Sequence, residues 1–371
     1  IASFCSPRHL SVIIKNIDLK QKNQIIEKRG PRLGSNEKAI HGFLKSNNIQ
    51  ENDIIIKDTK NGKFYFYLNQ INGINTSEVL PEIINEIINN FVWPKSQRWA
   101  YSELRWARPL RNILLLFNNQ PIEGKVAIDK NNFLNFSTYT FGHRNENKKI
   151  KVENIDEYER LLENNYLIID RKKRKNKIIN ATKLLLKDKD IKLLEDDYLL
   201  DEVLGLVEFP NVLIGTIDKQ FMNLPKEVLT TAMKVHQKYF SIIDDKNNLV
   251  PKFLFVSNTI PKKERDKSII EGNERVLKAR LSDANFFWKT DTSTKIENFN
   301  QKLKKVLFYE GLGSLHDKTI RLSAVSKYFS SLFKVDVSLA REACILSKFD
   351  LVSEMVGAVS YTHLRAHETL A

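Results

Sequence analysis

The sequence predicts an α+β fold of several domains, with mixed α/β N-terminal and middle domains followed by the start of an all-helical one. The chain has 371 residues, of which 42% are hydrophobic, which is enough for roughly two or three domains with real cores. Strand-like and helix-like segments are mixed over the first two thirds of the chain. From Ile296 to Ser353 the pattern is helical throughout, and no internal repeat is visible.

The first 90 residues predict strands and helices in alternation. We expect a mostly buried strand over residues 9–17 and a tight basic turn at Lys28–Arg32. Ser35 is a candidate N-cap for the next helix, and Ser77 opens a helix with an apolar stripe. Between these helices, Asn61-Gly62 is a strong hairpin signal that joins strands at residues 53–57 and 63–68.

Residues 91–117 combine arginines, tryptophans and an apolar run. Pro94 biases the segment away from helix, and the run after Pro109 is typical of a buried strand. Between the prolines, the side chains of Arg98, Trp99, Arg105, Trp106 and Arg108 alternate. Guanidinium groups bind phosphate and flat aromatic rings stack on bases, so the segment fits an RNA-binding surface. The alternative is a structural interpretation, in which the tryptophans are anchored in a core and solvated arginines surround them.

A strand near residues 121–128 precedes the segment Thr138–Asn145. Gly142 in that segment allows a tight bend, and His143 and Arg144 follow it. His143 is either a functional side chain or one held in a structural hydrogen bond, and the sequence leaves both open.

The middle of the chain predicts helices at residues 156–164 and 199–207, strands at 212–216, 239–243 and 253–256, and a helix that begins at Pro225. Residues 171–192 carry ten Lys or Arg and two Asp, and predict a helix that is either solvated or a nonspecific phosphate contact. A long helix over residues 262–288 is expected to break near Gly272-Asn273. His236, Gln237 and Lys238 crowd the boundary between a helix and a strand, where functional side chains often lie.

The net charge of +14 favours a polyanionic partner, although an abundance of Lys, Asn and Ile also arises from an AT-rich genome. Cys5 and Cys344 form no CxxC pair, so a structural zinc site is not expected and a reducing, cytoplasmic setting fits. No apolar run is long enough to span a membrane, and no phosphate-binding Gly-rich loop, GxSxG or HExxH motif occurs. We therefore expect no nucleotide-binding active site and no metal site in this chain.

His316-Asp317 resembles the adjacent pair of metal-dependent HD phosphohydrolases, but the nearest upstream histidine is His236, eighty residues away. Ser314 and Asp317 instead have the spacing of a capping box, which we favour over a metal site.

Taken together, the segments resemble the β subunit of bacterial heterotetrameric glycyl-tRNA synthetase. The matching stretches occur in family order between about Cys5 and Gly357: EKRGP (27–31), PKSQRW (94–99), RPLRNILLLF (108–117), TFGHR (140–144), LVEFPNVLIG (206–215), LPKEVLTTAMKVHQKYF (224–240), GNERVLKARLSDANFFW (272–288) and LGSLHDKTIRL (312–322).

This resemblance implies a tRNA-binding subunit of a ligase. A separate α subunit would bind ATP, Mg²⁺ and glycine and carry out the chemistry, so this chain would hold no catalytic residue and no cofactor. The implied partners are that α subunit, tRNA(Gly) and a second β subunit. The resemblance also implies a helical region like the HD fold, starting near Lys305, in which Asp350 alone occupies the place of the His-Asp pair.

We expect domains at residues 1–148, 149–300 and 301–357. The family's start before Cys5 is expected to be missing, and its anticodon-binding domain would follow beyond the end of the chain. Residues 358–371 depart from the family pattern and are expected to be foreign sequence, so His363 and His367 are not interpreted as metal ligands.

Two basic surfaces are predicted to face tRNA or the α subunit. The first consists of Arg98, Arg105, Arg108, Arg111, His143 and Arg144. The second consists of Lys234, His236, Lys238, Arg275, Lys278 and Arg280. The competing interpretations are an HD-type phosphohydrolase and a noncatalytic assembly module whose basic faces are only solvated.

Overall fold

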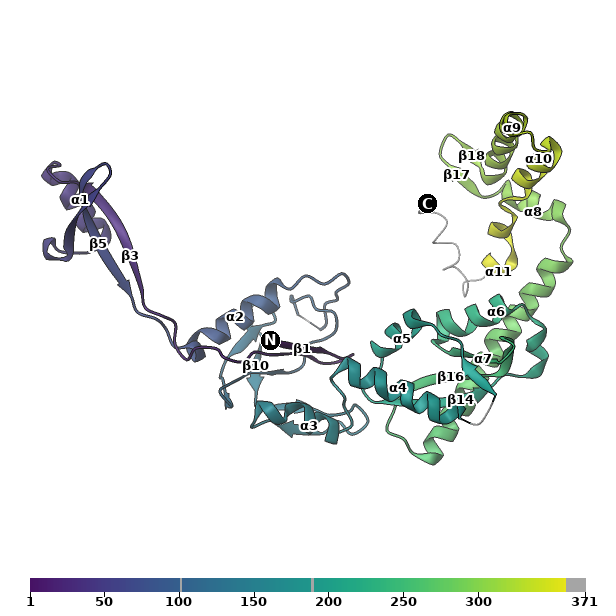
Figure 1. Cartoon of the computed structure of the whole chain (residues 1–371), viewed down its shortest axis with the longest axis horizontal. Helices are drawn as coiled ribbons and strands as arrows, with labels where there is room; N and C mark the ends of the chain where they lie inside the picture. The colour runs from purple at the N-terminus through teal and green to yellow at the C-terminus, as the bar shows by residue number, and fades with distance from the viewer. Residues whose placement is uncertain (101, 188–189, 358–371) are drawn as a thin grey trace. The chain divides into compact units, whose positions relative to one another are not determined.

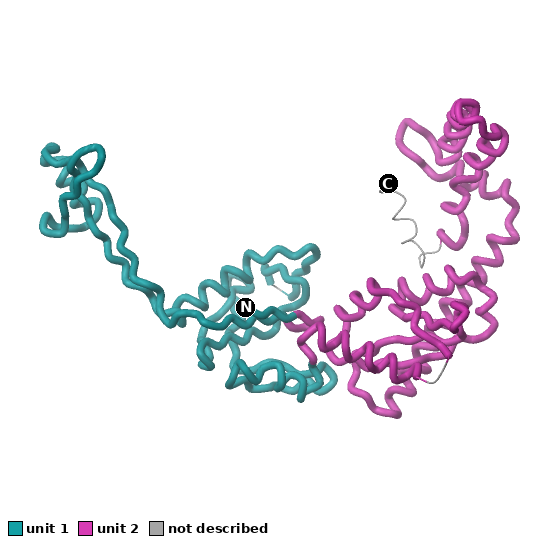
Figure 2. The backbone as a smooth tube through the Cα atoms, viewed as in Figure 1, with its two compact units in different colours: residues 1–4, 10–167 teal, residues 5–9, 168–371 magenta. Residues whose placement is uncertain are grey.

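The computed structural model describes residues 1–100, 102–187 and 190–357, and it divides the chain into two units (Figures 1 and 2). Unit 1 contains residues 1–4 and 10–167, and unit 2 contains residues 5–9 and those from 168 onward. Both units mix helices with small sheets, in agreement with the predicted mixture of α and β structure. The predicted boundaries at residues 148 and 300 stay predictions, and the segment 358–371 lies outside the described residues.

Unit 1 is built from many short strands and three α-helices among its described residues. They are β1 (Ala2–Cys5), β2 (Leu10–Ile13), β3 (Gln24–Arg32), α1 (Glu37–Asn47), η1 (Glu51–Asp53), β4 (Ile54–Thr59), β5 (Gly62–Ile71), α2 (Thr76–Asn90), β6 (Ile113–Leu114), β7 (Leu116–Phe117), β8 (Gln120–Pro121), β9 (Lys125–Ala127), β10 (Phe133–Ser137), β11 (Tyr139–Phe141), β12 (Lys149–Lys151), η2 (Ile155–Glu157) and α3 (Tyr158–Asn164).

Unit 2 carries longer helices. Its elements are α4 (Arg171–Leu186), β13 (Ile191–Leu193), α5 (Asp197–Leu204), β14 (Pro210–Thr216), η3 (Lys219–Asn223), α6 (Lys226–Thr231), the π-helical turn η4 (Ala232–His236), β15 (Phe240–Asp244), β16 (Leu249–Asn258), α7 (Lys263–Ser293), α8 (Ile296–Leu303), β17 (Leu307–Tyr309), β18 (Gly313–Ser314), α9 (Leu315–Phe333), α10 (Val337–Leu346), η5 (Phe349–Val352) and α11 (Glu354–Gly357).

The core of unit 2 is an antiparallel sheet in the order β13-β15-β16-β14. Successive side chains of a strand point to opposite faces, so Phe253 and Leu254 of β16 enter different cores. Phe253 packs in the cluster that contains Leu277 and Leu281 of α7, whereas Leu254 packs with residues of α4 and α5. Helices therefore cover both faces of this sheet (Figure 1).

Several sequence predictions are confirmed in outline. The hairpin is present as β4 and β5, with Gly62 at φ +109°, a left-handed value that favours glycine. The helix predicted after Ser35 begins one residue later than expected, because Asn36 caps it by accepting from the backbone N of Lys38. Pro225 likewise precedes its helix as the N-cap residue instead of occupying the first turn.

Two predictions of a turn or a break are wrong. Lys28–Arg32 is not a turn but the end of strand β3, which tolerates Pro31 because β3 is an edge strand with a register shift after Arg29. The helix α7 runs through Gly272-Asn273 unbroken, because Leu277, Leu281 and Ala284 anchor it in the core.

The strand predicted at residues 9–17 shortens to β2, and it is not mostly buried, since Leu10 and Val12 are more than half exposed. The run after Pro109 forms two strands of two residues each, β6 and β7, which are half-buried. Residues 296–353 are not helical throughout, because the hairpin β17–β18 interrupts them.

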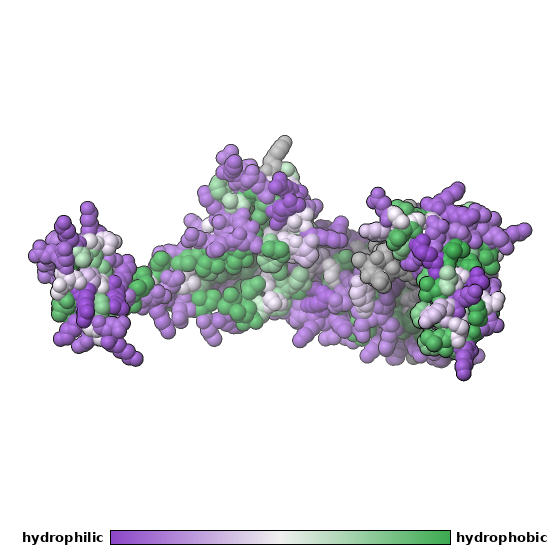
Figure 3. All heavy atoms as spheres, turned by 90° about the horizontal axis from the view of Figure 1, so that it is seen from above, coloured by the Kyte–Doolittle hydropathy of each residue, from purple (hydrophilic) through white to green (hydrophobic). Residues whose placement is uncertain are grey.

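The helix α9 packs against α10 through small polar residues. Thr319, Ser323 and Ser330 are buried, whereas Tyr328 and Phe333 are each 69% exposed. Small side chains allow two helices to approach closely, so the large apolar side chains of α9 face outward. Figure 3 shows hydrophobic residues gathered over this part of unit 2.

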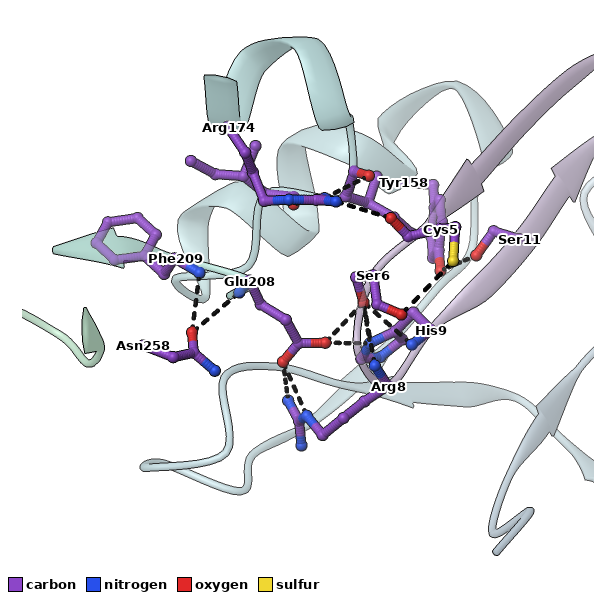
Figure 4. Close-up of polar contacts among 12 residues, drawn as sticks. Cys5, Ser6, Arg8, His9, Ser11, Tyr158, Arg174, Glu208, Phe209 and Asn258 are labelled. Carbon is purple, nitrogen blue, oxygen red and sulfur yellow. Dashed lines mark hydrogen bonds and ion pairs between the residues drawn. The ribbon is translucent and has the colours of Figure 1, made fainter. Parts of the chain in front are cut away.

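Residues Cys5–His9 are bound into unit 2 by two buried charged side chains (Figure 4). The Arg174 guanidinium is fully buried and donates to the carbonyl oxygens of Ile168 (2.7 Å), Ile169 (2.8 Å), Cys5 (2.8 Å) and Leu204 (3.3 Å). Burial lowers the pKa of Arg174, but an arginine keeps its charge at any physiological pH. Arg174 therefore ties the start of α4 and the end of α5 to the N-terminal segment.

The second charged group is the carboxylate of Glu208, which receives three side chains of the same segment (Figure 4). Ser6 Oγ donates to Oε1 at 2.7 Å, Arg8 Nε donates to Oε2 at 2.8 Å, and His9 Nδ1 lies 3.0 Å from Oε1. Burial acts to raise the pKa of Glu208, but the hydrogen bonds and charges of its partners lower that pKa to about 2.

We expect Glu208→Gln to destabilise unit 2 by about 3 kcal/mol at neutral pH, because the shift from 4.5 to about 2 is roughly two and a half pKa units. A depressed carboxyl pKa stabilises the fold above the unfolded value and loses that effect as the pH falls towards the folded value. The difference between wild type and variant should therefore shrink as the pH falls below about 4.5. Urea unfolding at a series of pH values measures it.

The matched control is Glu153→Gln, which removes an exposed carboxylate paired with Lys151. This control should change the unfolding free energy little at any pH. A difference for Glu208→Gln that stays constant down to about pH 3 would show that the carboxylate charge is not what holds the segment.

Candidate nucleic-acid interface

Three aromatic rings form a cluster in the Trp/Arg-rich segment of unit 1. Trp93 lies with its ring centroid 4.7 Å from that of Phe91 and 4.9 Å from that of Trp106, and Phe91 and Trp106 are 5.5 Å apart. These separations are typical of favourable aromatic pairs. Trp93 and Trp106 thus anchor one another, whereas the structural interpretation concerned Trp99 and Trp106. All three tryptophans are only half-buried and stay near the surface.

Arg98 and Arg105 are brought together beside this cluster. An antiparallel bridge joins Gln97 and Trp106 through two backbone hydrogen bonds of 2.9 and 3.2 Å. In antiparallel pairing the next residues inward face one another, which places Arg98 opposite Arg105. Both arginines are exposed, and Arg105 Nε donates a long hydrogen bond of 3.4 Å to Ser96 Oγ.

A hollow of about 740 Å³ opens at the same place. Its walls combine aromatic, amide and charged side chains, which is the mixture that ligand sites commonly show. The residues that line it are Asn89, Asn90, Phe91, Val92, Trp93, Ser96, Glu103, Leu104, Arg105, Ala127, Ile128, Asp129 and Lys130.

The other arginines of the first predicted surface are exposed, but His143 is not. Arg108 and Arg111 precede β6, and Arg144 lies in the turn between β11 and β12. Within the described residues, none of these three guanidinium groups forms an ion pair with a carboxylate. His143 is fully buried, and its Nδ1 accepts from the backbone N of Asn145 at 3.3 Å. The structure therefore removes His143 from the predicted surface and favours its structural interpretation.

Lysines of the second predicted surface are held in ion pairs within unit 2. Lys234 Nζ lies 2.5 Å from Asp196, Lys238 Nζ lies 2.9 Å from Glu202, and Lys278 Nζ lies 3.5 Å from Asp218. Arg275 is exposed, whereas His236 and Arg280 are half-buried. Burial acts to raise the pKa of Asp196, but the hydrogen bond and charge of Lys234 outweigh it and leave that pKa below its usual range.

The helix α5 and its N-cap residue Asp196 form ion pairs with basic side chains from two parts of unit 2. Besides Lys234 and Lys238, its carboxylates reach the basic helix α4, where Arg171 Nη2 lies 2.6 Å from Asp201 and Lys175 Nζ lies 3.9 Å from Asp197. Lys177 of α4 lies over the ring of Phe209, 3.2 Å from its centroid. The basic run of α4 is thus partly neutralised inside the protein, which weakens its interpretation as a phosphate contact.

Lys238 occupies a constrained position after the π-helical turn η4. Its φ of +57° is in the left-handed region, which costs a residue with a side chain roughly 1–2 kcal/mol. A small cavity of about 180 Å³ borders Gln237, Lys238 and Asn273. The hydroxyl of Tyr239 donates to Asn273 Oδ1 at 2.5 Å, and burial raises the pKa of this tyrosine to about 12. This group is neutral and hydrogen-bonded at ordinary pH.

The predicted capping role of Asp317 is confirmed. Ser314 Oγ accepts from the backbone N of Asp317 at 3.2 Å, and the Asp317 carboxylate accepts from the backbone N of Ser314 at 2.7 Å. His316 Nδ1 lies 2.6 Å from Asn300 Oδ1. Over residues 1–100, 102–187 and 190–357, no group of three or more His, Cys, Asp or Glu side chains is placed to hold a metal ion. No observation therefore supports the HD phosphohydrolase alternative.

Sequence reasoning missed Arg174 and Glu208. Both were in view, since Arg174 belongs to the basic run and Glu208 to LVEFPNVLIG, but neither spacing indicates burial. Their partners lie up to 202 residues away in the sequence.

Among the described helices, none combines the length and the apolar character needed to cross a lipid bilayer.

A family model described as "Glycyl-tRNA synthetase beta subunit" matches residues 1–364. Curated relatives named "Glycine--tRNA ligase beta subunit" include those of Rickettsia bellii, 39% identical over 361 residues, and Rickettsia canadensis, 38% identical over 355 residues. The relative of Rhodospirillum centenum is 35% identical over 376 residues. These matches cover 95–96% of this chain and 52–53% of the relatives, so the chain spans about half the length of the curated relatives it matches.

We expect the double variant Asp196→Asn and Glu202→Gln to bind a polyanion more tightly than wild type, because it releases Lys234 and Lys238 from their carboxylates. Asparagine keeps the cap that Asp196 provides to the backbone N of Leu199. The measurement is the salt concentration at which the protein elutes from immobilised heparin, which should rise.

The matched control is Asp245→Asn with Glu342→Gln, which adds the same charge at exposed carboxylates outside these ion pairs. Elution of both variants at the same salt concentration would mean that net charge alone governs binding and that the α5 ion pairs do not mask the lysines.

Proposed function

Because this chain belongs to the glycyl-tRNA synthetase beta-subunit family, we propose that it serves as the tRNA-binding part of a glycine–tRNA ligase. A separate α subunit would carry out the ATP-dependent attachment of glycine to tRNA(Gly), with ATP and Mg²⁺ bound there. The chain's own contribution is to hold the RNA and the partner subunit, and it needs no catalytic residue for that.

The observation that carries this proposal is the contrast between the two predicted surfaces. In unit 1 the cations of residues 91–117 are four arginines and Lys95, and the only carboxylate in that stretch is Glu103. In unit 2, α5 and its N-cap residue alone place four carboxylates against basic side chains. A phosphate must compete with those carboxylates in unit 2, whereas within the described residues no ion pair holds the arginines of this stretch of unit 1.

The aromatic cluster adds to this proposal. Single-stranded or flipped-out bases stack on aromatic rings, and guanidinium groups next to those rings bind the flanking phosphates. Arg105 lines the hollow together with Phe91 and Trp93, and the antiparallel bridge places Arg98 opposite Arg105. The exposed Arg108, Arg111 and Arg144 would extend the contact along the RNA backbone.

The ion-paired lysines of unit 2 fit the second part of the proposal better, namely contact with protein. Lys234, Lys238 and Lys278 are positioned by carboxylates, so they form a fixed pattern of alternating charge that suits a specific partner such as the α subunit or a second β subunit of a heterotetramer. We place the complex in the cytoplasm. The helical region from about Lys305 onward would act as a scaffold like the HD fold, without its metal ligands.

We expect Arg98→Gln combined with Arg105→Gln to lower the affinity for tRNA(Gly) about tenfold or more. Each lost phosphate contact reduces the slope of log K against log salt by about 0.7 to 0.9, so the slope should fall by roughly 1.5. Filter binding of a tRNA(Gly) transcript at several salt concentrations measures both quantities. Glycine activation by the α subunit should not change, because neither arginine takes part in it.

The control is Lys15→Gln with Lys238→Gln, which removes the same charge from lysines paired with Asp156 and Glu202. Its effect on tRNA affinity should be clearly smaller. Equal losses for the two double variants would contradict the assignment of unit 1 as the RNA contact. Absent or salt-insensitive RNA binding by the complex with the α subunit would instead support a pure assembly module.

A further inference from the structure

The hollow beside the aromatic cluster of unit 1 is bounded by chain segments that hydrogen bonds join. The backbone N atoms of Glu103 and Leu104 both donate to the carbonyl oxygen of Ile128, each at 3.0 Å. The backbone N of Ala127 in turn donates to Asn85 Oδ1 of α2 at 3.2 Å. The two lining segments are therefore fixed to each other and to α2, so the hollow has a defined shape.

Part of the lining of this hollow is apolar and aromatic. Leu104, which is 7% exposed, and Ile128 line it together with Phe91 and Trp93. Phe91 is 42% exposed, so part of its side chain is open to a ligand. A nucleobase stacks on such a surface through its flat face. The volume of about 740 Å³ is in the range of small-molecule sites.

The charged side chains that line the hollow differ in their engagement. The Asp129 carboxylate holds its own turn, because it accepts from Asn132 Nδ2 at 2.7 Å and from the backbone N of Asn132 at 2.9 Å. Glu103, Arg105 and Lys130 are exposed, and among the residues that the structure describes none of these three forms an ion pair. A ligand in the hollow thus meets two cations and one carboxylate outside any described ion pair.

These three charges suit a ligand with phosphate at one end and hydrogen-bond donors at the other. Guanidinium and ammonium groups such as those of Arg105 and Lys130 bind phosphate oxygens. A carboxylate repels phosphate, so Glu103 at the same hollow requires N–H donors from the ligand. A nucleotide meets both requirements, because its base carries N–H groups at a distance from its phosphate.

Among the four RNA bases, guanine matches a carboxylate best. Its N1–H and its N2 amino group lie side by side on the Watson–Crick edge, so each carboxylate oxygen accepts one hydrogen bond. Adenine, cytosine and uracil place an acceptor next to the single donor group on that edge, and this acceptor repels the second carboxylate oxygen. In a base pair the same edge of guanine is occupied, so only an unpaired guanine can use it.

We propose that the hollow binds one unpaired guanine nucleotide of RNA, with the base against Phe91 and Trp93, the N1–H and N2 amino group donating to Glu103, and the flanking phosphates bound by Arg105 and Lys130. This inference rests on the proposed tRNA function and deepens it, because it names the nucleotide that the Trp/Arg-rich segment selects.

The test compares two short oligouridylates that carry one central guanosine or one central inosine, because inosine lacks only the 2-amino group. We expect the full chain to bind the guanosine oligomer about five- to tenfold more tightly. Glu103→Gln should reduce this ratio to less than about twofold, because its amide presents one donor to the donors of the base. Fluorescence anisotropy of labelled oligomers at a fixed salt concentration measures the ratio.

The matched control is Glu123→Gln, which removes an exposed carboxylate of unit 1 that does not line the hollow. It should leave the guanosine preference unchanged. A wild-type ratio near one, or equal ratios in Glu103→Gln and Glu123→Gln, would overturn the proposal. Absence of oligomer binding at protein concentrations that saturate a tRNA(Gly) transcript would overturn it as well.

The phosphate contact has a test of its own. Lys130→Gln should lower the slope of log K against log salt for the guanosine oligomer by about 0.7. Lys125→Gln, which removes an ammonium group 4.0 Å from the ring centroid of Phe133, should change the slope less. Equal slopes would contradict the assignment of Lys130. If the wild-type chain does not bind the tRNA(Gly) transcript, the proposed function itself fails, whereas tRNA binding without guanosine preference contradicts only this inference.

Discussion

The burial of Arg174 is the constraint on which unit 2 depends. A guanidinium group without water must direct its donors at protein acceptors, and here those acceptors are backbone carbonyl oxygens from three separate stretches of chain. Once Cys5 is held in this way, Ser6, Arg8 and His9 reach the carboxylate of Glu208. The same contacts fix the end of α5, the helix that carries the carboxylates against Lys234 and Lys238.

The positive charge of this protein is therefore used in two different ways. In unit 2 the acidic helix α5 lies between basic elements, so part of the charge holds the fold together and is not free for a partner. In unit 1 the arginines of residues 91–117 have one acidic residue among them in the sequence, and a cluster of half-buried aromatic rings anchors their segment near the surface. By its number of basic residues alone, α4 would be a better candidate for phosphate binding than residues 91–117. The ion pairs of Arg171 and Lys175 with carboxylates of α5 make it a poorer one.

The sequence predicts best what depends on neighbouring residues. The Asn61-Gly62 hairpin, the Ser314–Asp317 capping box and the strands β15 and β16 follow from local patterns and are present. The strand through Gly30-Pro31 and the unbroken α7 could not be foreseen, because contacts distant in sequence override a local turn or break signal there. For the same reason the burial of His143 and the ion pairs of the predicted second surface were invisible, since they depend on Asn165, Asp196 and Glu202.

An exposed ion pair need not block a ligand, as the pair of Lys57 and Glu27 in unit 1 illustrates. Lys57 and Glu27 are both partly solvated, and such a pair contributes only about 0–1 kcal/mol, so a phosphate group can take the place of Glu27 at little cost. Lys57 Nζ also lies over the ring of Phe66, which is only 9% exposed. Such a solvated pair can exchange partners, because its separation costs little free energy. In unit 2, an incoming phosphate would instead have to displace carboxylates from several lysines at once, which favours a protein partner of matching charge there.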